Sequence, residues 1–137
     1  MKNLHVLGFS GSLRKGSFNT ALLRAAAELL PEGVALEVFD LSPIPLYNSD
    51  VETAGVPEAV QNFKARLAAA DALLIATPEY NYSNMLPLNK PEVYVTRAAE
   101  KFDAQGRLFD EPTRQRLREL SAALRDWTHR LRGESKN

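Results

Sequence analysis

Apolar residues follow two different patterns along this chain. Short apolar or alternating runs predict β-strands over residues 4–9, 35–41, 72–76 and 92–96. Apolar residues at helical spacing predict α-helices over 18–29 and 57–70, and a last helix that follows Asp110 and reaches Leu131. The stretch 42–55 is rich in Pro, Ser, Asn and Asp, which predicts a long loop. Strands that alternate with helices are typical of an α/β layer fold with a parallel sheet.

Residues that begin and end helices stand where these patterns change. Ser17 is the expected N-cap of the first helix, and Pro31 is expected to end that helix. Pro57 suits the first turn of the second helix. Asp110 stands just before the last helix and Pro112 just inside it, which predicts where that helix begins.

Two segments have patterns that predict their surroundings. The run over 72–76 is apolar throughout, which predicts a central strand covered on both faces. The last helix has one apolar face, and its arginines lie largely elsewhere. We expect that face to contact the core or a partner, and it consists of Leu117, Leu120, Leu124, Trp127 and Leu131.

Composition and charge narrow the range of functions. The chain has 137 residues, which predicts a single domain over 1–137. Its 17 basic and 17 acidic side chains cancel, which argues against general nucleic-acid binding. It has no cysteine, which excludes disulfides and thiolate chemistry, and its two histidines are far apart in sequence, which disfavours a histidine metal site. No apolar run approaches the roughly 20 residues of a membrane helix, and the first residues do not resemble a signal peptide, so we expect a cytoplasmic protein.

The loop after the first predicted strand has the composition of an anion-binding site. Gly11 and Gly16 permit tight turns, and Arg14 has a planar guanidinium that suits phosphate oxygens. The N-terminal N–H groups of the helix that follows also favour negative charge. A phosphate group therefore fits here, although a polar turn without a ligand has a similar composition. Short polar side chains occupy most of the remaining positions, at Ser10, Ser12, Ser17, Asn19 and Thr20.

The glycine spacing excludes two nucleotide-binding motifs. Gly11 and Gly16 match the glycines of GxxxxGK[ST], but Ser17 occupies the position of the lysine that binds the nucleotide phosphates. The pattern GxGxxG is also absent, because Gly8 and Gly11 are three residues apart.

The loop after the 72–76 strand offers flat aromatic surface and hydrogen-bonding groups. Tyr80 and Tyr82 supply the rings, Glu79 and Asn81 supply polar groups, and Pro78 stiffens the turn. A planar heterocycle fits against such a turn, and a surface loop with two incidental tyrosines is the alternative. Ligands of parallel sheets bind outside the carboxyl ends of the strands, where both loops are expected.

Together the two loops resemble those of a known family. GSLRKGSFNT followed by PEYNYS, each after a predicted strand, resembles the NADPH-dependent FMN reductase family, which includes bacterial chromate and quinone reductases and azoreductases. The resemblance is continuous over 1–84 and returns over 86–127. It implies a flavodoxin-like three-layer parallel sheet, shortened here to about four strands and three helices.

The resemblance also implies a cofactor site. The isoalloxazine ring of FMN is expected at Pro78, Glu79, Tyr80 and Asn81. NADPH or NADH would deliver a hydride to the flavin, and the reduced flavin would pass electrons to a quinone, an azo compound, a free flavin or an oxidised metal. Because the flavin carries this chemistry, neither a catalytic side chain nor a metal is expected. The FMN phosphate is expected at Ser10, Ser12, Arg14, Ser17, Asn19 and Thr20.

The chain departs from the family between the two matching regions. Asn84 and Met85 join these regions directly, where the family has a further helix, a strand with a Gly-rich loop, and another helix, so we infer an internal deletion. Residues 77–91 show no amphipathic pattern, which leaves the 57–70 helix as the only cover for one face of the sheet. We expect a second chain to cover that face, in a homodimer or higher homo-oligomer. Two alternatives stay open, namely an oligomeric remnant with weak or no flavin binding and a module that binds another phosphorylated ligand.

Overall fold

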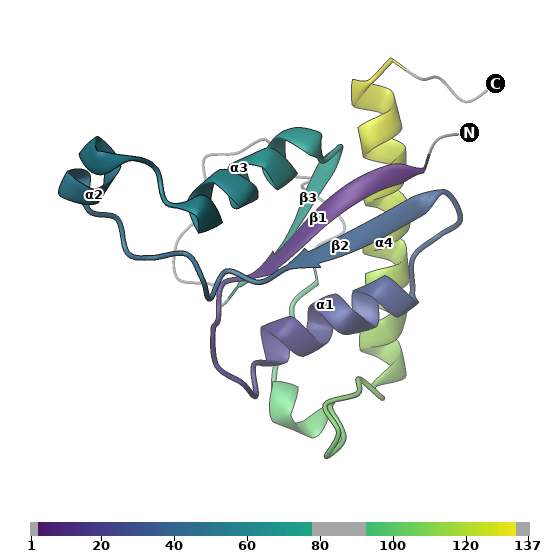
Figure 1. Ribbon diagram of the computed structural model, residues 1–137. Coiled ribbons are helices and arrows are strands. Elements are labelled where there is room, and N and C mark those ends of the chain that lie inside the picture. Colours follow the sequence, from purple (N-terminus) through teal and green to yellow (C-terminus); the bar gives the residue numbers. More distant parts are fainter. Residues whose placement is uncertain (1–2, 78–92, 134–137) are drawn as a thin grey trace.

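A three-stranded parallel sheet lies at the centre of the computed structural model, which describes residues 3–77 and 93–133 (Figure 1). The strands are β1 (Leu4–Ser10), β2 (Val34–Phe39) and β3 (Ala72–Ala76), and their order in the described sheet is β2-β1-β3. Leu4 aligns with Val34 of β2, and Ser10 aligns with Ala76 of β3. Because both pairings are parallel, the carboxyl ends of all three strands lie at one edge of the sheet.

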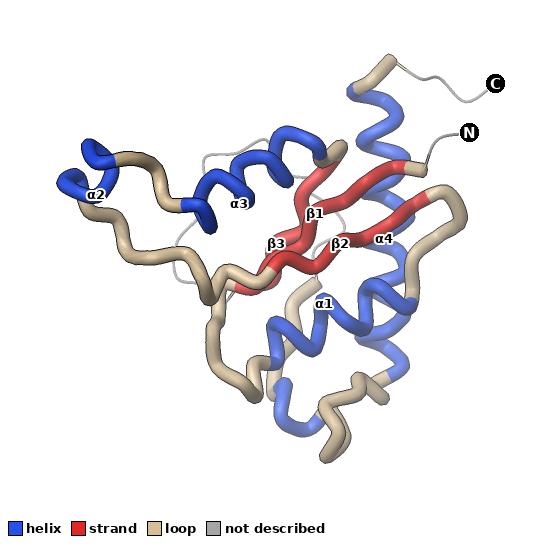
Figure 2. Tube along the Cα trace, viewed as in Figure 1, coloured by secondary structure: helices blue, strands red, loops and turns tan. Residues whose placement is uncertain are grey.

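Helices cover both faces of this sheet. α1 (Phe18–Glu28) and the long α4 (Glu111–Leu131) pack over one face, and α3 (Glu58–Ala69) lies over the other (Figure 2). A 3-10 turn, η1 (Ala98–Glu100), precedes α4. The three layers and the parallel strands confirm the fold class predicted from the alternation of strands and helices.

The main hydrophobic core lies between the sheet and the two helices α1 and α4. Leu36 and Leu74, from the two outer strands of the described sheet, pack against this core. Gly8 in β1 permits close packing there, because a Cβ at this position would lie 2.9 Å from Leu36 Cδ1 and 3.3 Å from Leu23 Cδ2. The buried members of the core cluster come from α1, from the segment before α4 and from α4 itself, and they are Ala21, Ala25, Ala26, Phe102, Leu108 and Leu117.

The opposite face is held to α3 by aromatic rings. The ring of Phe63 in α3 packs edge-on against Phe9, with 5.5 Å between ring centroids, and is tilted against Phe39 at 5.1 Å. These contacts lie over β1 and β2. Further from them, Leu73 and Ile75 of β3 keep 36% and 37% of their surface exposed, so α3 covers this face only in part.

The helix ends agree with the local sequence signals. The Ser17 side chain accepts a hydrogen bond from the N–H of Thr20, and Asp110 accepts one from the N–H of Thr113, so both residues are N-caps as predicted. Pro112 lies in the first turn of α4. Pro57 is itself the cap residue of α3, one position outside the helix in which it was expected.

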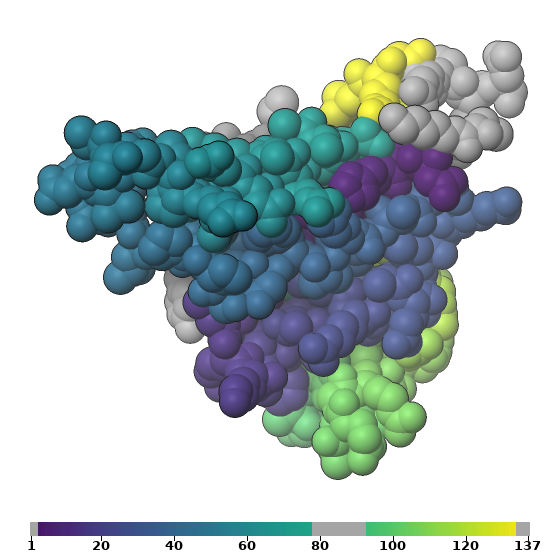
Figure 3. All heavy atoms as spheres, viewed as in Figure 1, coloured from purple at the N-terminus to yellow at the C-terminus, as the bar shows by residue number. Residues whose placement is uncertain are grey.

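The expected long loop over 42–55 was wrong in part, because it contains α2 (Ser49–Ala54). The side chain of Asn48 accepts a hydrogen bond from the N–H of Asp50 and so caps this helix. Asp50 and Glu52 lie in its first turn, where carboxylates stabilise a helix dipole. Local capping therefore forms a short helix without any buried face. α2 projects from the rest of the molecule (Figure 3).

Two predictions about strands were also wrong. Residues 93–96 do not form a strand, and Glu92 lies outside the described residues. Val93 instead packs against the core cluster, because no neighbouring strand pairs with this segment within the described sheet. β3 was expected to be central, but β1 occupies that position among the described strands and β3 borders β1 alone. An apolar run reports burial and does not specify which strand is central.

The buried face of α4 is offset from the predicted apolar face. Leu117 is buried as expected, but Leu131 is 65% exposed. Thr128 is buried, and its hydroxyl donates to the carbonyl of Leu124 at 2.7 Å, so its polar group is satisfied within the helix. Among the helices of the described residues, none is long and apolar enough to cross a membrane.

Candidate functional site

The loops that follow β1 and β3 lie side by side at the carboxyl edge of the sheet. Ser10 and Ala76 are the last aligned pair of these strands. One residue further, the N–H of Gly11 donates to the carbonyl of Ala76 at 2.8 Å. The pairing thus continues into the loop between β1 and α1. The two segments in which ligand contacts were expected therefore begin next to each other, as the parallel topology predicted.

Two serines shape the loop between β1 and α1. The Ser10 hydroxyl accepts from the N–H of Ser12 and donates to the Ser12 carbonyl, both at 3.1 Å. The N–H of Ser17 donates to the carbonyl of Arg14 at 3.0 Å, which closes a turn just before the helix. Ser17 is buried, and its hydroxyl caps α1 by accepting from Thr20 at 3.4 Å. These side-chain bonds place the remainder of the loop around the start of α1.

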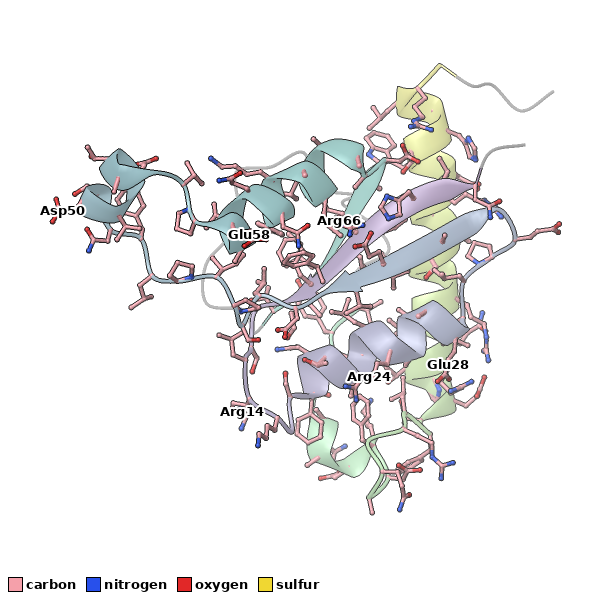
Figure 4. The ribbon with its side chains drawn as sticks, viewed as in Figure 1. Arg14, Arg24, Glu28, Asp50, Glu58 and Arg66 are labelled. Atoms are coloured by element: carbon pink, nitrogen blue, oxygen red, sulfur yellow. The ribbon has the colours of Figure 1, made fainter. Side chains whose placement is uncertain are left out.

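The other polar side chains of this loop retain unused hydrogen-bonding capacity. Among the described residues, no hydrogen-bond or ion-pair partner engages the side chains of Ser12, Arg14, Asn19 or Thr20. Arg14 is exposed and lies at the outer end of the loop (Figure 4). Hydroxyls, an amide, a guanidinium and the first N–H groups of a helix form a donor set that suits a phosphate.

The backbone at Gly16 has open space beside it. A Cβ built on Gly16 would have no atom within 4 Å, so the backbone at the tip of the loop is open to approach. A phosphate bound there would meet backbone and short side chains without displacing packed atoms. The six residues expected at the phosphate all lie between the last residue of β1 and the first turn of α1, and they are Ser10, Ser12, Arg14, Ser17, Asn19 and Thr20.

The second expected loop is described only at its first residue. Thr77 follows β3 directly and lies against Gly11. The residues expected to contact a planar ring are outside the described part of the chain, and they are Pro78, Glu79, Tyr80 and Asn81.

A carboxylate at the same edge was not anticipated from the sequence. Asp40 follows β2 and accepts from the Ser42 hydroxyl at 2.6 Å and from the Ser42 N–H at 2.9 Å. These hydrogen bonds, the side-chain one above all, hold the pKa of Asp40 below its usual value. Asp-x-Ser after a strand is a local turn signal, so the sequence contained this feature. Asp40 fixes the start of the segment that leads to α2.

Two hollows in the surface of the described residues lie away from the polar loop. A cleft of about 210 Å³ separates α3 from the segment before it, and a smaller one of about 90 Å³ lies beside α1. None of the six phosphate-loop residues lines either cleft. Within residues 3–77 and 93–133, no group of three or more His, Asp or Glu side chains is placed to hold a metal ion. The larger cleft is lined by Pro45, Leu46, Tyr47, Asn48, Val51, Glu52, Val56, Pro57, Val60 and Lys64.

Comparison with known proteins gives consistent similarities. The sequence profile of the family described as NADPH-dependent FMN reductase matches residues 4–84. An NAD(P)H-dependent FMN reductase of Pseudomonas aeruginosa is 38% identical over 182 aligned positions, which cover 96% of this chain and 98% of that relative. An NADPH:quinone oxidoreductase of Arabidopsis thaliana is 33% identical, with 96% and 95% covered. Among solved structures, FerB, a flavoenzyme NAD(P)H:(acceptor) oxidoreductase of Paracoccus denitrificans, superposes with a TM-score of 0.74 at 25% identity, covering 93% of this chain and 98% of that chain.

Proposed function

This chain belongs to the NADPH-dependent FMN reductase family, and from this premise we propose that it is an FMN-dependent NAD(P)H oxidoreductase. Its electrons pass through bound flavin to a small-molecule acceptor. Quinones are the first class to test, because relatives that match nearly the whole chain are quinone oxidoreductases. Azo compounds, free flavin and oxidised metals are further acceptors of the same two-electron or one-electron chemistry.

The observation that carries this proposal is a group of side-chain hydrogen-bond donors at the start of α1 that have no partner among the described residues. Ser12, Arg14, Asn19 and Thr20 bind the FMN phosphate, together with N–H groups of the first helical turn. Ser10 and Ser17 contribute by shaping the loop, since their hydroxyls are already bonded to backbone groups. The positive end of the α1 dipole adds to the attraction for the phosphate dianion.

The ring of the flavin is assigned to the segment that follows Thr77. Pro78, Glu79, Tyr80 and Asn81 line it, as in the family motif. Support comes from the contact of Thr77 with Gly11, which makes this segment begin beside the phosphate loop. FMN supplies the hydride and electron chemistry when it is bound. The chain's own contribution is to bind the phosphate, to orient the ring and to limit the access of water.

The internal deletion inferred from the sequence is part of the proposal. The alignment with the Pseudomonas relative runs over 182 positions, whereas the chain has 137 residues, so the relative has at least 45 residues without a counterpart here. The family profile stops at residue 84, where the two matching regions meet. Both observations support the loss of more than one strand–helix unit after Asn84 from a single shortened flavodoxin-like domain over 1–137.

A homo-oligomer follows from this deletion. Leu73 and Ile75 leave over a third of their surface exposed on the face that α3 covers only in part. A second copy packed on β3 would remove this apolar surface from water. Sedimentation velocity over a wide concentration range tests this, and a monomer at every concentration would contradict it. The cytoplasmic location expected from the sequence stays a prediction.

The experiment that tests the activity uses the purified full chain loaded with FMN under nitrogen. Addition of NADPH, and of NADH in a parallel sample, should bleach the visible absorbance of the flavin, and a quinone should then restore it. Stable FMN binding without bleaching would indicate a passive flavin-binding protein, whereas weak or absent FMN binding would support the alternative of a non-catalytic remnant. If the chain bound a simple phosphorylated sugar as well as it bound FMN, the first loop would be a general phosphate site.

A further inference from the structure

We propose that Phe102 is a positioning residue for the phosphate site and that it acts through Phe18, the first residue of α1. This inference rests on the proposed function and deepens it. Phe102 lies between η1 and α4, far along the chain from the phosphate loop. The family profile ends at residue 84, so the inference gives a role in FMN binding to a part of the chain that this profile does not reach.

The rings of Phe18 and Phe102 pack against each other at the start of α1. Their centroids lie 5.3 Å apart, and their planes are tilted by 33°. The segment that begins with η1 lies below the start of α1 (Figure 1). Ser17, the N-cap, directly precedes Phe18, and the proposed phosphate ligands Asn19 and Thr20 directly follow it. A displacement of the Phe18 ring therefore moves the helical turn that is proposed to bind the phosphate.

The polar cap by itself holds this turn weakly. The N–H of Thr20 lies 3.4 Å from the Ser17 hydroxyl, whereas such hydrogen bonds usually measure about 2.7–3.2 Å. On the side of the loop, a Cβ built on Gly16 would meet no atom within 4 Å, so the backbone there is open. The ring of Phe18, in contrast, packs against the core cluster to which Phe102 belongs. The aromatic contact therefore fixes the turn from its inner side.

Phe102 is itself held in place on both sides. It is 8% exposed, and it pairs with Leu108 in an antiparallel β-bridge. The ammonium of Lys101, the residue before it, lies 3.3 Å from a carboxylate oxygen of Asp110 and 3.2 Å from the hydroxyl of Thr113. These two residues belong to the start of α4. Phe102 therefore joins the beginnings of two helices, and a ring supported in this way can set the position of a binding group.

Two flavins separate this role from an ordinary loss of stability. FMN and riboflavin share the ring, but riboflavin has no phosphate. Phe102→Leu keeps an apolar side chain and removes the aromatic contact. It should weaken FMN binding on the order of tenfold, because binding groups must be held within about 0.5 Å of their productive geometry. Riboflavin affinity should stay unchanged.

Leu117→Val is the matched control. Leu117 is buried in the same core cluster as Phe102, but it comes from α4. This variant should lower the midpoint of thermal unfolding and leave the preference for FMN over riboflavin at its wild-type value. A role of Phe102 in stability alone would make the two variants behave alike.

Phe18→Leu tests the contact from its other side. It should lower FMN affinity as Phe102→Leu does, and the double variant should lose little more than either single variant, because one contact is broken only once. Phe18 is only half-buried, so this variant gives the same measurements if Phe102→Leu does not fold.

Hydrogen exchange measures the first turn of α1 without any flavin. The amides of Thr20 and Ala21 donate to the side chain and the carbonyl of Ser17, so their exchange reports on this turn. Exchange at these two amides should be faster in Phe102→Leu and in Phe18→Leu than in the wild-type chain. In Leu117→Val it should match the wild type.

The outcomes separate this inference from the proposed function. A reduced preference for FMN, together with faster exchange at the first turn, supports the inference. Equal weakening of both flavins, losses that add in the double variant, or unchanged exchange in both phenylalanine variants would overturn it and leave the proposed function standing. Failure of the wild-type chain to bind FMN would overturn the proposed function, and the role of Phe102 in phosphate binding would fall with it.

Discussion

Removal of the Arg14 guanidinium is the sharpest single perturbation of the proposed phosphate site. Arg14 is exposed, and within the described part of the chain its side chain has no partner. A charge-assisted hydrogen bond contributes about 1.5–3 kcal/mol, and exposure to solvent favours the lower end of that range. Arg14→Ala should therefore weaken FMN binding by about 1.5–2 kcal/mol, which corresponds to roughly 10- to 30-fold in Kd.

Fluorescence titration of FMN at low and high salt measures this effect. The wild-type affinity should fall as salt rises, because the Debye length shortens from about 10 Å at 0.1 M to about 3 Å at 1 M. The affinity of Arg14→Ala should depend less on salt. Arg24→Ala is the matched control, since Arg24 is an exposed arginine further along α1 (Figure 4). The free energy of unfolding should stay within about 0.5 kcal/mol in both variants.

The reasoning fails if Arg14→Ala binds FMN as tightly as the wild-type chain. That result would mean that the phosphate is bound elsewhere, even if the family assignment is correct. An equal loss of affinity in Arg14→Ala and Arg24→Ala would show that only the overall charge matters. Either result would remove the role assigned to the loop between β1 and α1.

Three further predictions concern folding. Asp110→Ala removes the N-cap of α4 and should lower the free energy of unfolding by about 1–2 kcal/mol in urea denaturation, and an unchanged value would show that the cap is dispensable. Hydrogen bonds from Thr113, its hydroxyl first, lower the pKa of Asp110, so the stabilisation it gives is complete above the ordinary value of 3.8 and is lost as pH falls through the lowered pKa. Unfolding midpoints measured from neutral to acidic pH should therefore converge for the wild type and Asp110→Ala, whereas a constant difference would contradict this sign. Phe63→Ala removes the ring that packs on Phe9, and calorimetry should show a loss of about 2–3 kcal/mol, with Phe63→Leu as the milder control.

Features with a local cause could be predicted from the sequence. The caps Ser17 and Asp110 were correct because a cap bonds to a residue three positions away. The residue types of the loop between β1 and α1 predict a phosphate site, which stays a prediction, and parallel topology correctly placed this loop beside the start of the second loop. α2 was missed because a helix of six residues is too short to show a periodic apolar face.

Features that depend on distant partners could not be predicted. Residues 93–96 have strand-forming side chains, but a strand exists only where another strand offers hydrogen bonds. The buried side of α4 includes Thr128, whose hydroxyl is satisfied within the helix, so hydropathy alone misjudges which side is buried. The contact between Gly11 and Thr77 joins two loops, and nothing in either loop alone reveals it.

Equilibrium binding of FMN to the purified full chain tests the central claim most directly. Dialysis against FMN, with absorbance read on both sides of the membrane, gives affinity and stoichiometry together. The account predicts saturable binding at micromolar concentration, with one flavin per chain and a weaker affinity for riboflavin than for FMN. An absence of saturable binding, or equal affinity for the two flavins, would contradict the claim that this loop binds the phosphate of a flavin.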